Sequence, residues 1–358
     1  MKNLASALAL SAILTLPFAL CGAPVLATND KIEARQSQIT TDPRYDRDPS
    51  LFRAADNTYW LFFARGRDPR GVRDLAGYNP DLDYYDIYFK TAKSIPGLEK
   101  AHEMLLPVTP PDNAQRDVSA LQTSDGRIWV FTSTGLGPGS QRSVYYYTYD
   151  GDWHGPTLVP GTDYAAHISV LESGGRIWIF FDIGYALKVV SADATAVAWS
   201  SPIAVADDAT IAKAIVDEGK FYVVWTTPSG SGIYLSTSSN GTTWSTTAVP
   251  IAAWPDSGAT NWDPVLIKDK DIFRLVWAPD AGSEGQFLAT TTSPNPIDET
   301  SWSTPLKLTT ASSGADNWWD FWPQPYAKGV QYLFYTSERN ATATGRADGN
   351  IWMMRLKP

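Results

Sequence analysis

Ionisable residues recur at one position of a repeated pattern, each directly before a short apolar segment. They are Asp48, Asp117, His167, Lys213 and Asp263, while a sixth such segment begins with Trp322. Several acids around one pocket are what cleavage of a glycosidic bond requires. One carboxylic acid protonates the leaving oxygen, and a second carboxylate activates water or attacks the anomeric carbon. Crowded like charges raise one pKa and so keep a proton available near neutral pH.

The elements that must bring these residues together are six repeats of strand, turn and strand. Each apolar segment leads to a turn with Gly, Asn or Asp, which tolerate the positive φ of tight hairpins. A second, aromatic-rich strand follows at residues 59–63, 128–131, 177–181, 221–225, 273–277 and 332–335. Four strands in each of six repeats predict an all-β, six-bladed β-propeller with antiparallel blades around a central funnel. A β-sandwich or jelly roll is the alternative, but neither predicts so regular a recurrence.

In a propeller the first strand of each blade lines the channel, so the six segment starts should meet at the axis. The expected catalytic residues are Asp48 and Asp117, with the acid supplied by Asp83, Asp86 or Asp263. The residues expected to bind substrate are Arg47, Arg65, His167, Lys213, Trp262, Asp320 and Trp322. A structural explanation competes, because Asp before Pro commonly starts a turn, as at Asp48 and Asp263.

Composition narrows the function classes. The net charge is −9, and no Lys/Arg-rich stretch is interleaved with aromatic residues, so a nucleic-acid partner is not expected. The fifteen Trp and seventeen Tyr suit strand cores and also suit stacking on sugar rings. With three His in the chain, a multi-histidine zinc site is not expected, and neither is a cofactor.

The N-terminal residues indicate export. Lys2 precedes an apolar run from Leu4 to Leu20, and Val25-Leu26-Ala27 offers a small-x-small cleavage site. We interpret residues 1–27 as a signal peptide, 28–44 as a linker and 45–358 as one propeller domain. The expected location is secreted or periplasmic, as a monomer without a membrane span. A lipoprotein anchor at Cys21 is the less favoured alternative because the bulky Leu20 precedes it.

The start of the propeller region resembles the sialidase superfamily of six-bladed propellers. The resemblance is carried by Arg47-Asp48-Pro49, a following aromatic strand, and Asp83 and Asp86 ahead of the third strand. Residues 237–244 are similar to an Asp-box turn, with Ser239 in the Asp position. The resemblance implies that Arg47 binds a substrate carboxylate and that Asp83 or Asp86 is the acid/base. Trp322 stands where sialidases place the nucleophilic Tyr.

The Asp-Pro-Ser opening also resembles arabinanase/xylosidase-type propeller glycosidases. This resemblance implies that Asp48 is the base and that Asp117 modulates it, while His167 stands where these enzymes have the acidic Glu. Those enzymes have five blades.

Three functions therefore remain open. The first is a glycoside hydrolase acting on glycans, sialidase-like or arabinofuranosidase/xylosidase-like. The second is a non-catalytic, lectin-like propeller, although the axial residues differ between blades and so favour one asymmetric site. The third is a polysaccharide lyase in which His167 removes a proton and Arg47 neutralises a uronate carboxylate.

Overall fold

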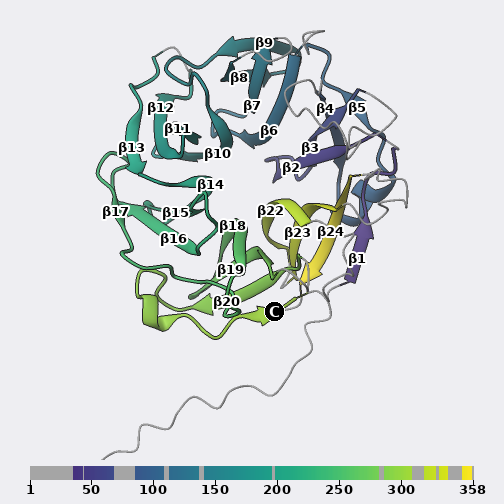
Figure 1. Ribbon diagram of the computed structural model, residues 1–358. Helices are drawn as coiled ribbons and strands as arrows, with labels where there is room; N and C mark the ends of the chain where they lie inside the picture. The colour runs from purple at the N-terminus through teal and green to yellow at the C-terminus, as the bar shows by residue number, and fades with distance from the viewer. Residues whose placement is uncertain are drawn as a thin grey trace, which may run out of the picture. The chain divides into compact units, whose positions relative to one another are not determined.

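The computed structural model describes residues 35–42, 44–67, 85–108, 113–136, 141–195, 198–281, 286–308, 318–327, 330–337 and 349–356. It confirms the all-β prediction, with six blades of four antiparallel strands arranged as a propeller ring (Figure 1). The predicted signal peptide and Asp83 lie outside the described residues. No helix in the described ranges is long and apolar enough to cross a membrane.

The first three blades follow the chain order. Blade 1 consists of β2 (Asp46–Arg53), β3 (Tyr59–Gly66), β4 (Tyr85–Ala92) and β5 (Met104–Leu105). Blade 2 consists of β6 (Asn113–Gln122), β7 (Ile128–Leu136), β8 (Arg142–Tyr149) and β9 (Trp153–Leu158). Blade 3 consists of β10 (Ala166–Ser173), β11 (Arg176–Ile183), β12 (Ala186–Asp193) and β13 (Ile203–Ala206).

The remaining blades complete the ring. Blade 4 consists of β14 (Thr210–Asp217), β15 (Lys220–Thr226), β16 (Ile233–Ser238) and β17 (Ser245–Thr246). Blade 5 consists of β18 (Thr260–Asp269), β19 (Ile272–Asp280), β20 (Ala289–Ser293) and β21 (Leu306–Lys307). Blade 6 consists of β22 (Trp318–Ala327), β23 (Val330–Ser337), β24 (Asn350–Leu356) and β1 (Arg35–Gln38). Each first strand contacts the first strands of both neighbouring blades, so all six surround the axis (Figure 1).

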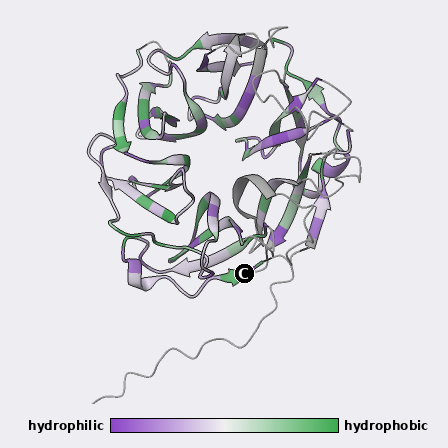
Figure 2. Cartoon of the chain, in the orientation of Figure 1, coloured by the Kyte–Doolittle hydropathy of each residue, from purple (hydrophilic) through white to green (hydrophobic). Residues whose placement is uncertain are grey.

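The core lies between the blades. The second strands are nearly continuous apolar runs because both of their faces are covered; Leu61, Phe62 and Phe63 in β3 are fully buried. Hydrophobic and hydrophilic stretches alternate around the ring in Figure 2. Burying one such large apolar side chain contributes roughly 1.5–3 kcal/mol, so stacked blades can hold the ring together without disulfides.

The N-terminal strand β1 corrects the predicted linker. Residues 35–38, placed in the linker 28–44 by the sequence, pair antiparallel with β24, from Arg35 opposite Arg355 to Gln38 opposite Trp352. β1 is thus the outer strand of the last blade. Its sequence Arg-Gln-Ser-Gln has no apolar alternation, because an edge strand on the outside of a ring need not bury a face.

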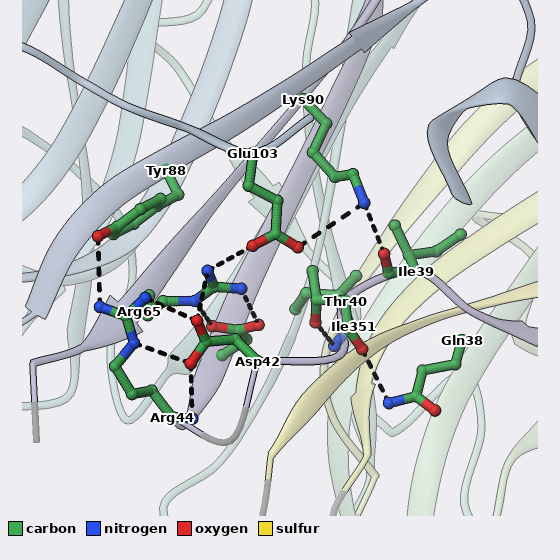
Figure 3. Close-up of polar contacts among 11 residues, drawn as sticks. Gln38, Ile39, Thr40, Asp42, Arg44, Arg65, Tyr88, Lys90, Glu103 and Ile351 are labelled. Atoms are coloured by element: carbon green, nitrogen blue, oxygen red, sulfur yellow. Dashed lines mark hydrogen bonds and ion pairs between the residues drawn. The ribbon is translucent and has the colours of Figure 1, made fainter. Parts of the chain in front are cut away.

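A group of charged residues with a buried centre, which we call the buried charge cluster, ties this N-terminal segment to blade 1 (Figure 3). It consists of Asp42, Arg44, Asp46, Arg65, Lys90 and Glu103. At its centre, Arg65 is 1% exposed and pairs with Asp46 at 2.5 Å and Glu103 at 2.5 Å. Lys90 donates to the carbonyl of Ile39 at 2.7 Å. The cluster therefore joins the first blade to the segment that completes the last one.

The segment that resembles an Asp-box forms the turn between β16 and β17. The Asn240 side-chain oxygen accepts hydrogen bonds from the backbone N–H groups of Thr242 and Thr243, both at 2.9 Å. The Trp244 indole donates to the Gly241 carbonyl at 3.2 Å. Its assignment as an Asp-box stays a prediction.

Candidate active site at the propeller axis

A backbone bulge at the start of each first strand positions the axial residues. The strand register is interrupted in all six blades: between residues 47 and 50, 116 and 119, 166 and 169, 210 and 213, 262 and 265, and 319 and 322. Five bulge residues have positive φ: Asp48 (55°), Asp117 (52°), His167 (49°), Ile211 (52°) and Asp263 (50°). Such a backbone costs roughly 1–3 kcal/mol per residue and persists only where its surroundings over-determine it.

The bulges correct the predicted alignment in two blades. In blade 4 the bulge residue is Ile211, and Lys213 comes two positions later. In blade 6 the interrupted register puts residue 320, not Trp322, at the corresponding backbone position. A shift of two residues keeps every side chain on the same face of a strand, so the apolar pattern cannot detect it.

A narrow cavity lies where the bulges meet. It is lined by Asp48, Pro49, Asp117, Val118, His167, Ile211, Lys213 and Asp263. The structure thus brings together the five ionisable residues predicted to converge, from five different blades. Its volume of about 20 Å³ suits roughly one water molecule. A sugar ring cannot enter it, so these groups can act only on atoms presented at its mouth.

Two axial carboxylates also connect neighbouring blades. Asp48 Oδ2 accepts the backbone N–H of Asp117 at 2.8 Å, and Asp117 Oδ2 accepts that of His167 at 3.1 Å. Two residues further on, serine hydroxyls repeat the contact, with Ser50, Ser119 and Ser169 accepting from the backbone of the next blade. Asp48 and Asp117 therefore also have a structural role, through contacts between blades and not through the local turn expected at Asp48.

Cations hold Asp117 in its ionised form. Desolvation alone would raise its pKa, but the charges of His167, Arg142 and Arg47 outweigh it and lower the pKa to about 2. Arg47 also places Nε 3.1 Å from Asp48 Oδ2. Arg142, at the start of β8, was not predicted from the sequence. It lies on the third strand of its blade, so the pattern of first-strand starts gave no signal for it.

Asp263 has the opposite environment. It is 4% exposed, and its Oδ2 is buried without a hydrogen-bond partner among the described residues. Burial raises the pKa of Asp263 to about 6, against the lowering effect of His167, Lys213 and Arg47. A buried carboxyl oxygen without a partner is costly to ionise, so this group retains its proton to a higher pH than an ordinary aspartate.

The imidazole of His167 contacts the carboxylate of Asp182, a residue that was not predicted from the sequence. Its Nδ1 lies 2.9 Å from Oδ1 of Asp182, and Thr210 Oγ1 lies 3.2 Å from Oδ2 of the same carboxylate. Burial would lower the pKa of His167, but the nearby Asp182, Asp117 and Asp263 raise it to about 9. The imidazole is therefore protonated at neutral pH and adds a positive charge to the axial site.

The other predicted site residues lie elsewhere or make different contacts. Asp86 pairs with Arg67 at 2.6 Å, and Arg65 lies in the buried charge cluster with its carboxylate partners. Trp262 is half-buried, and its indole donates to Thr260 Oγ1 at 2.8 Å. The side chains of Asp320 and Trp322 lie outside the described part of the structure. In the described ranges, no group of three His, Cys, Asp or Glu residues is arranged to hold a metal ion.

Comparison with known proteins supports the fold. No family model and no curated protein matches the chain. Among solved structures, it is similar to a Dyadobacter fermentans protein of unknown function, with 13% identity and a TM-score of 0.66 over 90% of this chain and 99% of that one. It is also similar to the phage phi92 endosialidase, with 10% identity and a TM-score of 0.63 over 91% of this chain and 69% of that one. It is similar as well to the Trypanosoma rangeli sialidase in complex with sialic acid, with 10% identity and a TM-score of 0.58 over 90% of this chain and 59% of that one.

The number of blades separates the two family resemblances. The structure has six blades, as the sialidase resemblance implies, and not the five of the arabinanase/xylosidase type. The resemblance to the latter group rests on the Asp-Pro-Ser opening and on the positions of Asp48 and Asp117. The chain has a sialidase-like, six-bladed propeller fold.

Proposed function

We propose that the protein is a glycoside hydrolase whose reaction takes place at the mouth of the axial cavity. The observation that carries the proposal is the pair Asp263 and Asp117. Both carboxyls line one cavity, yet the pKa of Asp263 is raised to about 6 and that of Asp117 is lowered to about 2. Two acids with separated pKa values are the requirement for an acid and a carboxylate working on one bond.

In the proposed reaction, protonated Asp263 donates its proton to the glycosidic oxygen as the bond from that oxygen to the anomeric carbon breaks. Ionised Asp117 either removes a proton from an attacking water or attacks the anomeric carbon itself. In the second case, water later releases the sugar and returns a proton to Asp263. Asp48 fixes the backbone of Asp117 and, with Arg47, completes the charged wall of the site.

The charge of His167 argues against a lyase. A general base must be unprotonated at the working pH, whereas His167 has a pKa raised to about 9 by three carboxylates. Its proposed role is electrostatic: the imidazolium keeps Asp117 ionised. The sialidases among the similar solved structures make sialosides the first substrates to test, followed by arabinofuranosides and xylosides.

A screen of 4-nitrophenyl glycosides and oligosaccharides with the purified protein tests the proposal. We expect turnover of at least one substrate and a loss of about 10²-fold or more in Asp117→Asn. Asn can still accept the His167 N–H, so the blade contact should survive and the variant should fold. Asp271→Asn, in an exposed turn of blade 5, is the matched control and should keep full activity. Glycan binding without any turnover would instead support the lectin-like alternative.

We also propose that the protein is exported, because its N-terminal residues have the pattern of a signal peptide. The mature protein should begin at Thr28, because the small-x-small site ends at Ala27. Intact mass measurement of the native protein checks this. A mature chain that retains residues 1–27 would contradict it, and a lipid-modified Cys21 would support the anchored alternative.

A further inference from the structure

Three tryptophans occupy the same position in the first three blades, but one of them is in a different environment. Trp60, Trp129 and Trp178 lie on the second strands, opposite Phe52, Leu121 and Leu171 of the first strands. Trp129 is 1% exposed and Trp178 7%, whereas Trp60 is only half-buried. Trp129 and Trp178 therefore serve as internal references for the environment of Trp60.

Their indole N–H groups differ in the same way. Trp129 donates to Thr123 Oγ1 at 3.0 Å, and Trp178 donates to the Ser173 carbonyl at 3.1 Å. The Trp60 indole makes no hydrogen bond to any described residue, and it is not among the buried polar atoms without a partner. Its N–H is thus accessible and available to a ligand.

The residue two positions before the tryptophan explains part of the difference. In blade 2 this residue is Arg127, whose guanidinium lies 5.3 Å over the Trp129 ring. In blade 1 the same place holds the short Thr58, whose hydroxyl is engaged with Asp56 at 2.7 Å. No long side chain from this position covers Trp60.

The space beside Trp60 is a cavity of about 350 Å³ between blades 1 and 2. Its lining includes Trp60 and Tyr149, whose ring centroids are 5.8 Å apart, and polar groups from three turns. It also includes Ala54, which follows β2, whereas axial Asp48 lies near the start of that strand. At about 3.3 Å per residue, the six residue steps from Asp48 to Ala54 place this cavity at most roughly 20 Å along the strand from the axial site. Its volume falls within the usual range for small-ligand sites.

Two of the three carboxylates at the rim of this cavity are paired with cations. Asp56 pairs with Lys93 at 3.0 Å and Asp125 with Arg127 at 2.7 Å, while Asp150 lies 3.1 Å from His154 Nε2. Asp56 and Asp125 therefore need no cationic ligand for neutralisation. Each still has lone pairs that can accept hydrogen bonds from hydroxyl groups.

We propose that this cavity is a second binding site, for an uncharged carbohydrate. Trp60 and Tyr149 supply aromatic surface for the apolar face of a sugar ring, and the Trp60 N–H supplies a donor. The carboxylates of Asp56, Asp125 and Asp150 accept from sugar hydroxyls. The site lies at the other end of the strands from the axial cavity, so it would hold a glycan without taking part in bond cleavage.

Nitrogen-15 NMR of the tryptophan indoles tests this, because each of the fifteen Trp gives one N–H signal. Trp60→Phe identifies the Trp60 signal by its loss. The full-length protein and its Asp263→Asn variant are titrated with xylohexaose, arabinohexaose and maltohexaose, and with tetragalacturonate as the charged comparison. We expect the Trp60 signal to shift with at least one neutral oligosaccharide in both proteins, while the Trp129 and Trp178 signals stay in place.

Affinity measurements on variants complete the test. Trp60→Ala should weaken binding by about tenfold or more, and Trp60→Phe by less, because Phe keeps an aromatic face but not the donor. Trp178→Phe, the matched change in blade 3, should leave the affinity unchanged. The proposal is overturned if no neutral oligosaccharide shifts Trp60, if only tetragalacturonate does, or if a well-folded Trp60→Ala binds as well as the wild type. A protein inactive on every glycoside could still show this binding, so the two proposals fail separately.

Discussion

Replacing Asp263 with Asn is expected to lower kcat/KM for a glycoside with a poor leaving group by about 10²–10⁴-fold. The axial site would lose a carboxyl whose environment lets it hold a proton near neutral pH. A 2,4-dinitrophenyl glycoside needs little protonation of its leaving oxygen, so its hydrolysis should fall far less. Comparing the two substrates in wild type and variant therefore separates a missing acid from a damaged site.

The pH dependence of kcat/KM tests the same role of Asp263. The acid must be protonated, and the pKa of Asp263 is about 6, so wild-type kcat/KM should fall as pH rises above about 6. Asp117 must be ionised, and its pKa of about 2 keeps it so throughout the measurable range. The alkaline limb near pH 6 should disappear in Asp263→Asn. If the variant retains that limb, or loses equal activity on both leaving groups, Asp263 is not the acid.

Stability provides a readout of Asp263 that needs no substrate. Its pKa rises from 3.8 to about 6 on folding, so the folded state binds a proton more tightly than the unfolded state. The free energy of unfolding therefore falls as pH rises from about 4 to 6, and above pH 6 the cost is about 3 kcal/mol. Asp263→Asn should thus be more stable than the wild type at pH 8, with little gain at pH 4, as measured by urea denaturation.

The fold could be predicted from the sequence because the propeller repeats its pattern six times. Trp60, Trp129 and Trp178 stand at one register position, and the runs around them show strands buried on both faces. The convergence of Asp48, Asp117 and other segment starts follows from that repeat and needs no contact information. Features that recur in every blade can therefore be predicted from the sequence.

The rest depends on residues outside the first strands, which the pattern of segment starts does not show. Arg142 and Asp182 lie on second and third strands, yet they control the charge of Asp117 and His167. In blade 4 the bulge also lies two residues before the predicted position, an offset that leaves the apolar pattern unchanged, and this hid Ile211. Arg65 shows the converse case, because it was expected to bind substrate but its carboxylate partners are Asp42, Asp46 and Glu103 of the protein itself.

Replacing Arg65 with Met should strongly destabilise the fold while leaving the axial site intact. Asp46 is 0% exposed and pairs with Arg65 through both oxygens, at 2.5 and 2.7 Å. Removing one partner of a buried ion pair leaves an uncompensated charge and costs about 3–5 kcal/mol. Arg44→Met is the matched control; its side chain is 26% exposed and pairs with the partly exposed Asp42, so its loss should cost about 1 kcal/mol or less.

The pH dependence and a rescue variant distinguish lost charge compensation from lost packing. Burial already raises the pKa of Asp46 to about 6 with Arg65 present, and removing the cation should raise it further. The deficit of Arg65→Met should therefore shrink as pH falls from above the variant's raised pKa down to about 6, because a protonated Asp46 needs no counter-charge. Adding Asp46→Asn should recover much of the loss at pH 8. Urea denaturation of the single and double variants measures both effects, and a deficit that is the same at pH 5 and pH 8 and is not rescued would show that Arg65 acts by filling space.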